Sequence, residues 1–318
     1  MAADLFYIVL FLTAFGSIAW SSVILTQHIL KIRIPFPFCS LMMLFYLVPL
    51  FRPGLKLVAE DPDWIRPYLT AAVVWGTGFF LSVGITIFRT WFAYAAIRKY
   101  APCRDACVLH ALQSCAERLR MRRVPEILYG DLKEPACVLA AVQPRIILSR
   151  RMVQRWSEPE LAVILTHELV HIRRKHLFLQ KCFDLIVCIH WFNPLAWTAR
   201  REFSIACEMD CDQTIFRTFP QLSAAGYAGF LLRMMKQSMP NRHKAAGAIG
   251  SLDFLLARRR FQNILFPPSA IRKCGSVLLS LAVIVAVVSA SLVGSARYFY
   301  PSSAGTMQIE RSMSRGSY

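Results

Sequence analysis

Four long apolar stretches without charged residues stand out along the chain. They cover residues 5–25, 35–51, 69–88 and 275–296. A helix of about 21 residues is about 31 Å long, which is enough to cross a hydrocarbon core about 30 Å thick. The pattern therefore predicts four transmembrane helices. The stretch 35–51 is short and flanked by prolines, which leaves a buried hairpin helix as its alternative.

Two of these stretches carry further information. The first begins with MAAD, without the basic residues that precede the apolar core of a signal peptide, so it is expected to stay in the membrane. The third contains Gly76, Gly78 and Gly84, small residues that let neighbouring helices approach closely. Close helix packing is therefore expected along the third stretch.

The more polar region between the third and fourth stretches predicts a sheet followed by a helix. Short β-rich runs at residues 127–129, 137–142 and 146–148 are separated by glycine and proline, which predicts a small sheet. The sequence SEPE at residues 157–160 is a capping box with proline in the first turn, so a helix is predicted to begin there. Apolar residues then recur at helical spacing as far as Ile172.

Residues 177–197 are apolar enough to be interpreted as a fifth span. Polar and charged side chains interrupt them, at Gln180, Lys181, Asp184, His190 and Asn193. This mixture favours an amphipathic helix that lies in the membrane interface, with Trp191 and Trp197 at the depth of the lipid headgroups.

Composition and charge agree with a membrane protein. Hydrophobic residues make up 56% of the chain and the mean hydropathy is +0.43, which is too apolar for an ordinary soluble domain. Residues 98–273 hold 28 of the 37 lysines and arginines against 14 of the 19 acidic residues. This excess predicts that the region is cytoplasmic and close to anionic lipid headgroups, with both termini outside. The basic runs 173–175 and 258–260 are interpreted as solvated or membrane-facing surface, and no direct nucleic-acid binding is expected, because no helix-turn-helix or aromatic–basic pattern is present.

The ten cysteines are expected to be free thiols, because nearly all fall in the predicted cytoplasmic region or in the apolar stretches. The pairs Cys103/Cys107 and Cys207/Cys211 have a CxxxC spacing that is compatible with metal binding. Ordinary packing of small side chains on a helix produces the same spacing.

The motif HELVH at residues 167–171 is the strongest chemical signal. HExxH fixes only three residues and also occurs by chance, but here it lies inside the predicted capped helix. His167 and His171 are about 40° apart around the axis of such a helix, so both imidazoles can bind one zinc ion. Glu168 then stands beside the open coordination position.

Zinc also needs a third protein ligand. The extension HExxHxxGxxH is absent, because Arg174 and Leu177 replace its glycine and third histidine. The sequence EMDCD at residues 208–212 supplies carboxylates instead. Glu208 is the predicted third ligand, and Asp212, one turn later, is predicted to accept a hydrogen bond from the outer nitrogen of a ligating histidine.

Taken in order, HELVH, Arg174, HWFNPL at residues 190–195 and EMDCD resemble peptidase family M56, the BlaR1/MecR1-type membrane metallopeptidases. Three predicted spans precede these motifs and one follows, so the resemblance extends to about residue 296. It implies an α-helical membrane protein with four transmembrane helices and a cytoplasmic α+β gluzincin-type zinc protease domain. The expected domains are three helices in 1–96, the protease domain in 97–273, the fourth helix in 275–296 and a short outer tail in 297–318.

The resemblance also implies a site and a function. His167, His171 and Glu208 are the implied Zn²⁺ ligands, Glu168 is the general base, and His190 is a candidate transition-state donor. The implied location is the bacterial inner membrane. The implied activity is regulatory proteolysis, either of the protease itself or of a cytoplasmic protein such as a transcriptional repressor.

The chain departs from the family pattern within the domain and at its end. His176 stands where an aspartate is expected, and Ala140 and Ser149 replace the glycine and proline usual around the sheet. Only about twenty residues, without an SxxK serine, follow the last predicted span. Antibiotic sensing by this chain alone is therefore not expected.

Two other functional classes stay open. A housekeeping membrane protease of the M48 type has the same ligands, but a clear pair of spans is then expected between HExxH and the glutamate. A non-catalytic membrane receptor with a structural zinc has the same sequence pattern. Glu202 and Asp210 are the alternative carboxylate ligands.

Charge distribution predicts the topology in a form that labelling can test. A cysteine introduced at Ser303 is expected to react with a membrane-impermeant maleimide in intact cells, whereas one introduced at Ser251 is expected to react only after lysis. The unmodified chain gives the background from its own cysteines. The reverse labelling pattern would rule out a cytoplasmic substrate.

Overall fold

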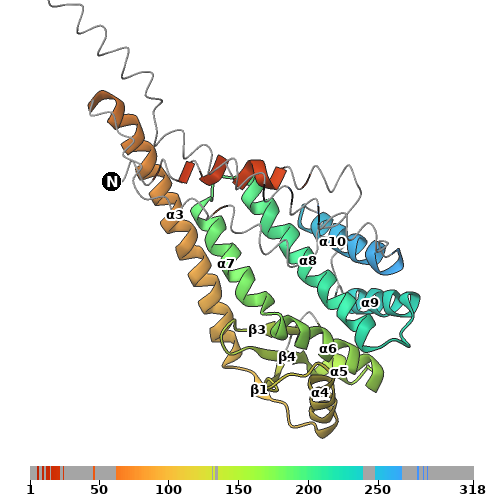
Figure 1. Ribbon diagram of the computed structural model, residues 1–318. Helices are drawn as coiled ribbons and strands as arrows, with labels where there is room; N and C mark the ends of the chain where they lie inside the picture. The colour runs from red at the N-terminus through yellow and green to blue at the C-terminus, as the bar shows by residue number, and fades with distance from the viewer. Residues whose placement is uncertain are drawn as a thin grey trace, which may run out of the picture.

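The computed structural model describes residues 62–130, 132, 135–238 and 248–266, together with scattered positions in 6–24, Tyr46 and three positions in 278–285 (Figure 1). The predicted span 5–25 is described only in part, 35–51 only at Tyr46 and 275–296 only at three positions, and the tail 297–318 lies outside the described residues.

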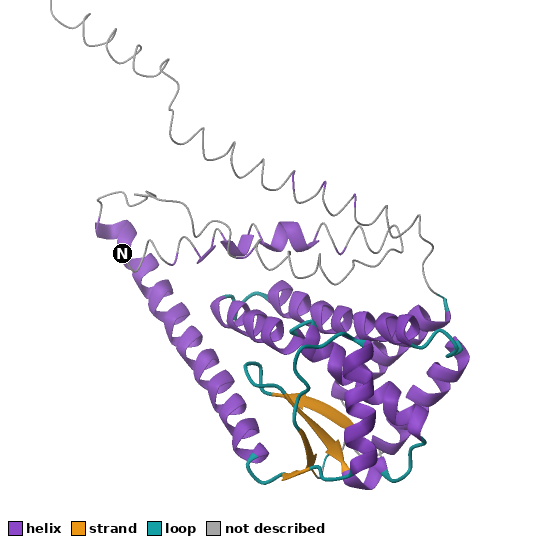
Figure 2. Ribbon diagram, turned by 60° about the horizontal axis from the view of Figure 1, so that its bottom comes forward, coloured by secondary structure: helices purple, strands orange, loops and turns teal. Residues whose placement is uncertain are grey.

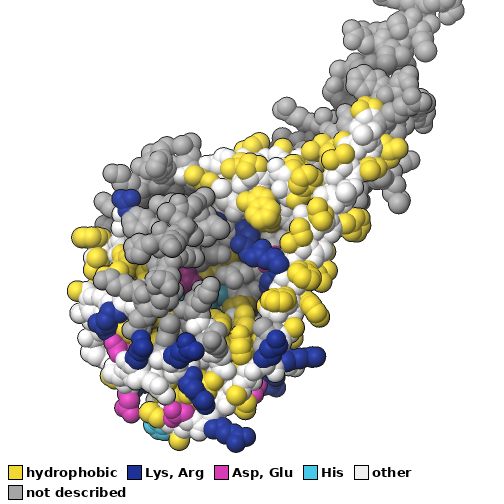
Figure 3. Space-filling view, turned by 180° about the vertical axis from the view of Figure 1, so that it is seen from behind, with side chains coloured by type: hydrophobic (Ala, Val, Ile, Leu, Met, Phe, Trp, Pro, Cys, Tyr) yellow, Lys and Arg dark blue, Asp and Glu magenta, His cyan; other side chains and the backbone are white. Residues whose placement is uncertain are grey.

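Among the described residues, one helix is long and apolar enough to cross a membrane. Helix α3 (Pro62–Ile97) has 36 residues, which corresponds to about 54 Å, and its apolar part is Leu69–Ala95. The predicted span 69–88 lies inside this part. Large apolar side chains such as Phe80 and Phe92 are exposed on α3. Figure 3 shows hydrophobic side chains along this helix, whereas most Lys and Arg side chains in the same view lie over the rounded lower end of the molecule.

The predicted small sheet is present. Its strands are β1 (Ala101–Pro102), β2 (Ile127–Gly130), β3 (Ala136–Leu139) and β4 (Arg145–Ser149), in the order β1-β2-β4-β3. β2 and β4 pair in parallel, whereas β1 and β3 are antiparallel edge strands. β3 ends before the predicted residue 142, because Ala140 has a left-handed φ of 72° where the chain turns towards β4.

The two faces of the sheet contact different helices. Ile146 and Leu148 pack with α4 (Ala106–Arg118) and α6 (Glu158–Arg173). Ile147, between them on β4, packs with Ile97 at the end of α3. The sheet therefore lies between α3 and the other helices, as Figure 2 shows.

Helix α6 begins where the capping box predicts. The Glu160 carboxylate accepts hydrogen bonds from the backbone N–H of Ser157 at 3.1 Å and from its hydroxyl at 3.0 Å. Leu165 and Leu169 are fully buried in the core against α4 and the sheet. The buried face and the cap together fix the orientation of α6. They therefore also fix the direction in which its opposite face points.

Residues 177–197 do not form a single helix. Helix α7 (His176–Ile189) has 14 residues and is about 21 Å long, and after a turn α8 (Pro194–Thr218) begins. Asn193 is the N-cap of α8, and its side chain accepts a hydrogen bond from the Leu195 N–H at 3.0 Å. α7 is too short to cross a bilayer, so the alternative of a fifth span is wrong.

Helix α7 packs between α3 and α8. Phe183 of α7 and Phe203 of α8 are buried together, with ring centroids 4.6 Å apart. The remaining helices are α5 (Arg150–Val153), α9 (Ala224–Ser238) and α10 (Ala248–Leu265) (Figure 1).

Among the described residues, one of the three glycines expected to permit close packing has a close neighbour. A Cβ atom added at Gly78 would lie 2.3 to 2.6 Å from ring atoms of Trp191, whereas one added at Gly76 or Gly84 would meet no described atom within 4 Å. The Trp191 ring is held by a hydrogen bond of 3.2 Å from its Nε1 to the Trp75 carbonyl. The absence of a side chain at Gly78 therefore lets the turn between α7 and α8 pack closely against α3.

This difference predicts opposite effects of the same substitution. Gly78→Ala is expected to lower the thermal unfolding temperature of the detergent-purified protein, because Trp191 must move and lose its bond to Trp75. Gly76→Ala and Gly84→Ala are matched controls, in which the better helix propensity of alanine leaves the unfolding temperature unchanged or higher. Equal unfolding temperatures for all three variants would contradict the packing described here.

Candidate metal centre

The two histidines of HELVH lie on the face of α6 that points away from the sheet core. Their Nε2 atoms are 3.3 Å apart. Both side chains are largely buried, and Glu168, between them in sequence, is buried as well. The helix therefore presents two imidazoles as a pair, as the i, i+4 spacing predicts.

Helix α8 adds Glu208 to this pair. Its Oε2 lies 3.3 Å from His167 Nε2 and its Oε1 lies 3.5 Å from His171 Nε2. In a tetrahedral zinc site with bonds of about 2.0–2.1 Å, neighbouring ligand atoms are about 3.3–3.4 Å apart. The Nε2–Nε2 distance and the distances from each nitrogen to its nearer Glu208 oxygen are thus close to the spacing in a tetrahedral zinc site. The donor set of two nitrogens and a carboxylate fits zinc.

The charges around Glu208 favour its ionised form. Burial alone would raise the pKa of this carboxyl, but the neighbouring Arg260 guanidinium and the hydrogen bond with His167 hold the pKa well below its ordinary value. Arg260 Nη1 lies 3.0 Å from Glu208 Oε2. The interpretation of residues 258–260 as basic surface is therefore wrong for Arg260, whose side chain is only 21% exposed.

The two histidines differ in their surroundings. Burial lowers the pKa of His171 to about 3, so this imidazole is neutral at pH 7. Burial acts on His167 in the same direction, but the hydrogen bond and negative charge of Glu208 outweigh it and raise the pKa of His167. A neutral imidazole and an ionised carboxylate are the forms that bind a metal.

Cys211 is a competing ligand that the sequence pattern also suggested. Its thiol lies with His167 and His171 in a group of potential metal ligands. However, burial and then the nearby carboxylates raise the pKa of Cys211 well above its ordinary value, and a protonated thiol is a poor ligand. The ionised Glu208 is therefore the better third ligand. The eight described cysteines are free.

Asp212 does not make the bond predicted for it. Its Oδ1 lies 3.9 Å from His167 Nδ1, beyond hydrogen-bonding distance. Asp212 instead accepts hydrogen bonds from the Tyr227 hydroxyl at 2.7 Å and from Arg260 at 2.7 and 3.0 Å. Its direct role is therefore to hold Arg260, which in turn contacts Glu208.

His176 is the partner that the sequence did not reveal. Its Nδ1 lies 3.0 Å from Nδ1 of His171. On a continuous helix this residue would be on a different face, but Lys175 adopts a left-handed φ of 55°, where α6 ends and α7 begins. The resulting bend returns His176 to His171. Neither glycine nor proline marks the bend in the sequence.

The other predicted residues lie away from the metal position. His190 is at the far end of α7 from His176, about 21 Å along the axis, where its Nδ1 is 2.8 Å from the Thr13 hydroxyl and its ring packs on Tyr46. Its role as a transition-state donor is therefore not supported. Glu202, an alternative ligand, pairs with Arg259.

Asp210, the other alternative carboxylate, also has partners of its own. Its Oδ2 lies 3.4 Å from Arg174 Nε and 3.6 Å from His176 Nε2. Arg174, in the run 173–175 interpreted as solvated or membrane-facing surface, is 45% exposed and forms an ion pair with Asp210.

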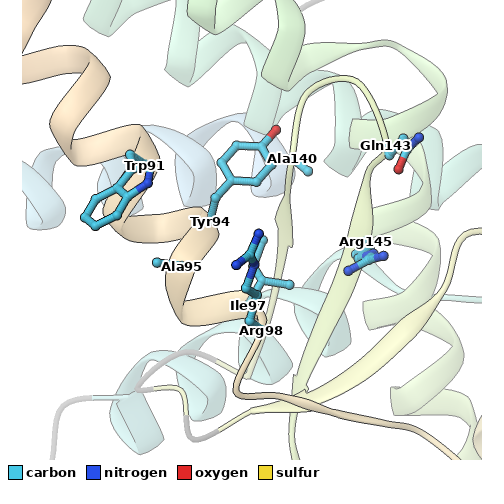
Figure 4. Close-up of a pocket in the computed structure, with 8 residues that line it drawn as sticks. All are labelled: Trp91, Tyr94, Ala95, Ile97, Arg98, Ala140, Gln143 and Arg145. Atoms are coloured by element: carbon cyan, nitrogen blue, oxygen red, sulfur yellow. The ribbon is translucent and has the colours of Figure 1, made fainter.

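A cavity of about 330 Å³ lies apart from these residues (Figure 4). It is formed by the end of α3 and the β3–β4 hairpin, with Trp91, Tyr94 and Arg98 on one side and Gln143 and Arg145 on the other. Ile97, which lines it, packs on the sheet face opposite α6. The cavity is therefore not part of the candidate metal centre.

Residues 58–264 match the family described as BlaR1 peptidase M56. The chain belongs to this family. The match includes α6 with HELVH and α8 with Glu208, so the M56 region contains every residue of the candidate metal centre described above. A mostly helical M56 peptidase domain is therefore present.

Two curated relatives are more distant. The chain is 23% identical to the "Regulatory protein BlaR1" of Bacillus licheniformis over 184 residues, 57% of this chain and 30% of that protein. It is 22% identical to the "Methicillin resistance mecR1 protein" of Staphylococcus aureus (strain Mu50 / ATCC 700699) over 123 residues, 38% of this chain and 21% of that protein. The matched part thus spans less than a third of the relatives' length.

The choice between Glu208 and Cys211 can be tested by metal content. Glu208→Gln replaces an anionic ligand by a weak neutral one and is expected to lose zinc, whereas Cys211→Ala is expected to keep about one zinc per chain. Elemental analysis of the purified variants measures this, and circular dichroism shows whether each is folded. Zinc retained by Glu208→Gln and lost from Cys211→Ala would reverse the assignment.

Proposed function

We propose that the chain is an integral membrane zinc metalloendopeptidase that performs regulatory proteolysis, cutting itself or a cytoplasmic protein such as a transcriptional repressor. The observation that carries the proposal is the group of His167, His171 and Glu208 at tetrahedral spacing, with Glu168 beside it, within an M56 domain. The exposed apolar helix α3 supports a membrane location.

In this proposal the chain's own residues have distinct roles. His167, His171 and Glu208 hold Zn²⁺, which when bound activates a water molecule and polarises the scissile carbonyl. Glu168 accepts the proton of the attacking water and later donates it to the nitrogen of the leaving amine. Arg260 keeps the Glu208 carboxylate ionised and in place.

The sheet offers a place for the substrate backbone. β3 is an edge strand, and it packs directly against α6, which carries two of the three metal ligands. An extended peptide can add to such an edge through main-chain hydrogen bonds. We infer that the substrate pairs with Ala136–Leu139, next to α6.

The alternatives are less well supported. A protease of the M48 type is expected to have a pair of spans between HExxH and the glutamate, but only α7, about 21 Å long, connects α6 to α8. A structural zinc is normally enclosed by four protein ligands. Here three ligands meet beside a buried glutamate, and the fourth candidate, Cys211, has a raised pKa that favours its non-ligating thiol form. This arrangement supports catalysis.

The general base can be separated from the metal ligands. Glu168→Gln keeps the side-chain volume and both histidines, so zinc content is expected to stay at about one per chain while peptide cleavage falls at least about 100-fold. The cleavage site is first identified by mass spectrometry of new termini in protein purified with and without a chelator.

Glu202→Gln is the matched control, because Glu202 pairs with Arg259 and contacts none of the metal ligands. It is expected to cleave at the wild-type rate. Wild-type cleavage by Glu168→Gln would show that another group is the base, and a wild-type protein that binds zinc without cleaving any peptide would favour the receptor with a structural zinc.

A further inference from the structure

Beyond the three metal ligands, a buried histidine contacts the outer nitrogen of one of them. His176 has no exposed surface, and its Nδ1 lies 3.0 Å from His171 Nδ1. The opposite nitrogen, Nε2, faces Oδ2 of Asp210 at 3.6 Å. Arg174 Nε lies 3.4 Å from the same oxygen. These four side chains form a continuous row from the metal position to the junction of α6 and α7.

The direction of the hydrogen bond between His171 and His176 follows from the chemistry of imidazole. A neutral histidine that binds a metal through Nε2 carries its proton on Nδ1, so His171 Nδ1–H is a donor. His176 Nδ1 must then be the acceptor, which places the proton of a neutral His176 on Nε2. This N–H faces the Asp210 carboxylate, whose Oδ2 lies 3.6 Å away. That distance is longer than a hydrogen bond, but the negative charge favours the tautomer with its proton on Nε2.

We propose that His176, oriented by Asp210, is a positioning residue that fixes the tautomer and ring orientation of the zinc ligand His171. The inference rests on the proposed function, since it needs zinc at the three ligands. Groups that hydrogen-bond to ligating histidines typically change metal affinity by roughly 10- to 100-fold when removed. His176 therefore has the role towards His171 that the sequence predicted for Asp212 towards a ligating histidine. Asp210 contacts His176 on its other side.

Three substitutions at His176 separate hydrogen bonding from packing. His176→Phe keeps the ring volume without an acceptor. His176→Asn places a carbonyl oxygen near the former Nδ1 and so keeps the acceptor, whereas His176→Gln reaches the former Nε2 position and leaves His171 without one. The measurement is the zinc dissociation constant, obtained by competition with a chromogenic chelator, together with the unfolding temperature of each metal-free variant.

The expected result is a dissociation constant raised roughly 10- to 100-fold in His176→Phe and His176→Gln and close to wild type in His176→Asn. Asp210→Ala is expected to weaken zinc binding in the wild-type background but to have no further effect in His176→Asn, which lacks the N–H that Asp210 orients. If His176 had a purely structural role, Asp210→Ala would weaken zinc binding equally in both backgrounds.

Two outcomes would overturn the inference. If His176→Phe bound zinc as tightly as wild type, or if His176→Asn bound it as weakly as His176→Phe, His176 would only fill space. Failure of the proposed function looks different, because a protein that binds zinc with these affinities but cleaves no peptide retains the positioning role and loses the catalytic one.

Discussion

The contact between α6 and α8 determines whether a metal site exists at all. HELVH supplies only two ligands, and the third comes from a helix that begins some twenty residues later, after the whole of α7. The buried aromatic contact of Phe183 with Phe203 joins α7 to α8, and Leu165 and Leu169 seat α6 on the sheet. Ordinary apolar packing thus places Glu208 within 3.3 to 3.5 Å of two imidazoles.

Part of this arrangement could be predicted because it depends on local periodicity. The capping box defines the start of α6, and the i, i+4 spacing pairs His167 with His171. Glycine and proline residues separate the strands of the sheet. Glu208 could be proposed as a ligand from the sequence for a related reason. A carboxylate followed one turn later by a second carboxylate is a short-range pattern on one helix face. Its proximity to HELVH, in contrast, depends on tertiary packing.

The residues that were misjudged depend on tertiary contacts. Arg260 lies in a run of three arginines, which resembles a basic surface until α10 is placed against α8 and one guanidinium of the three turns inward. The contact of His176 with His171 could not be foreseen because a left-handed lysine ends α6, and lysine carries no turn signal comparable to glycine. His190 had the right residue type, but a short helix of about 21 Å separates it from the metal position.

The three acidic residues of EMDCD show why these distant partners matter. Glu208 and Asp212 lie one turn apart on the same face of α8, and Arg260 contacts both. Asp210 points to another face, where Arg174 and His176 meet it. Three carboxylates within five residues of α8 would repel one another, and the neighbouring cations offset this repulsion. The compensating cations are Arg174 at the C-cap of α6 and Arg260 of α10. The residues that keep these charges compensated are therefore also residues that join the helices around the metal centre. A bare HExxH helix placed on another scaffold would lack this compensation, and its third ligand would have no fixed position.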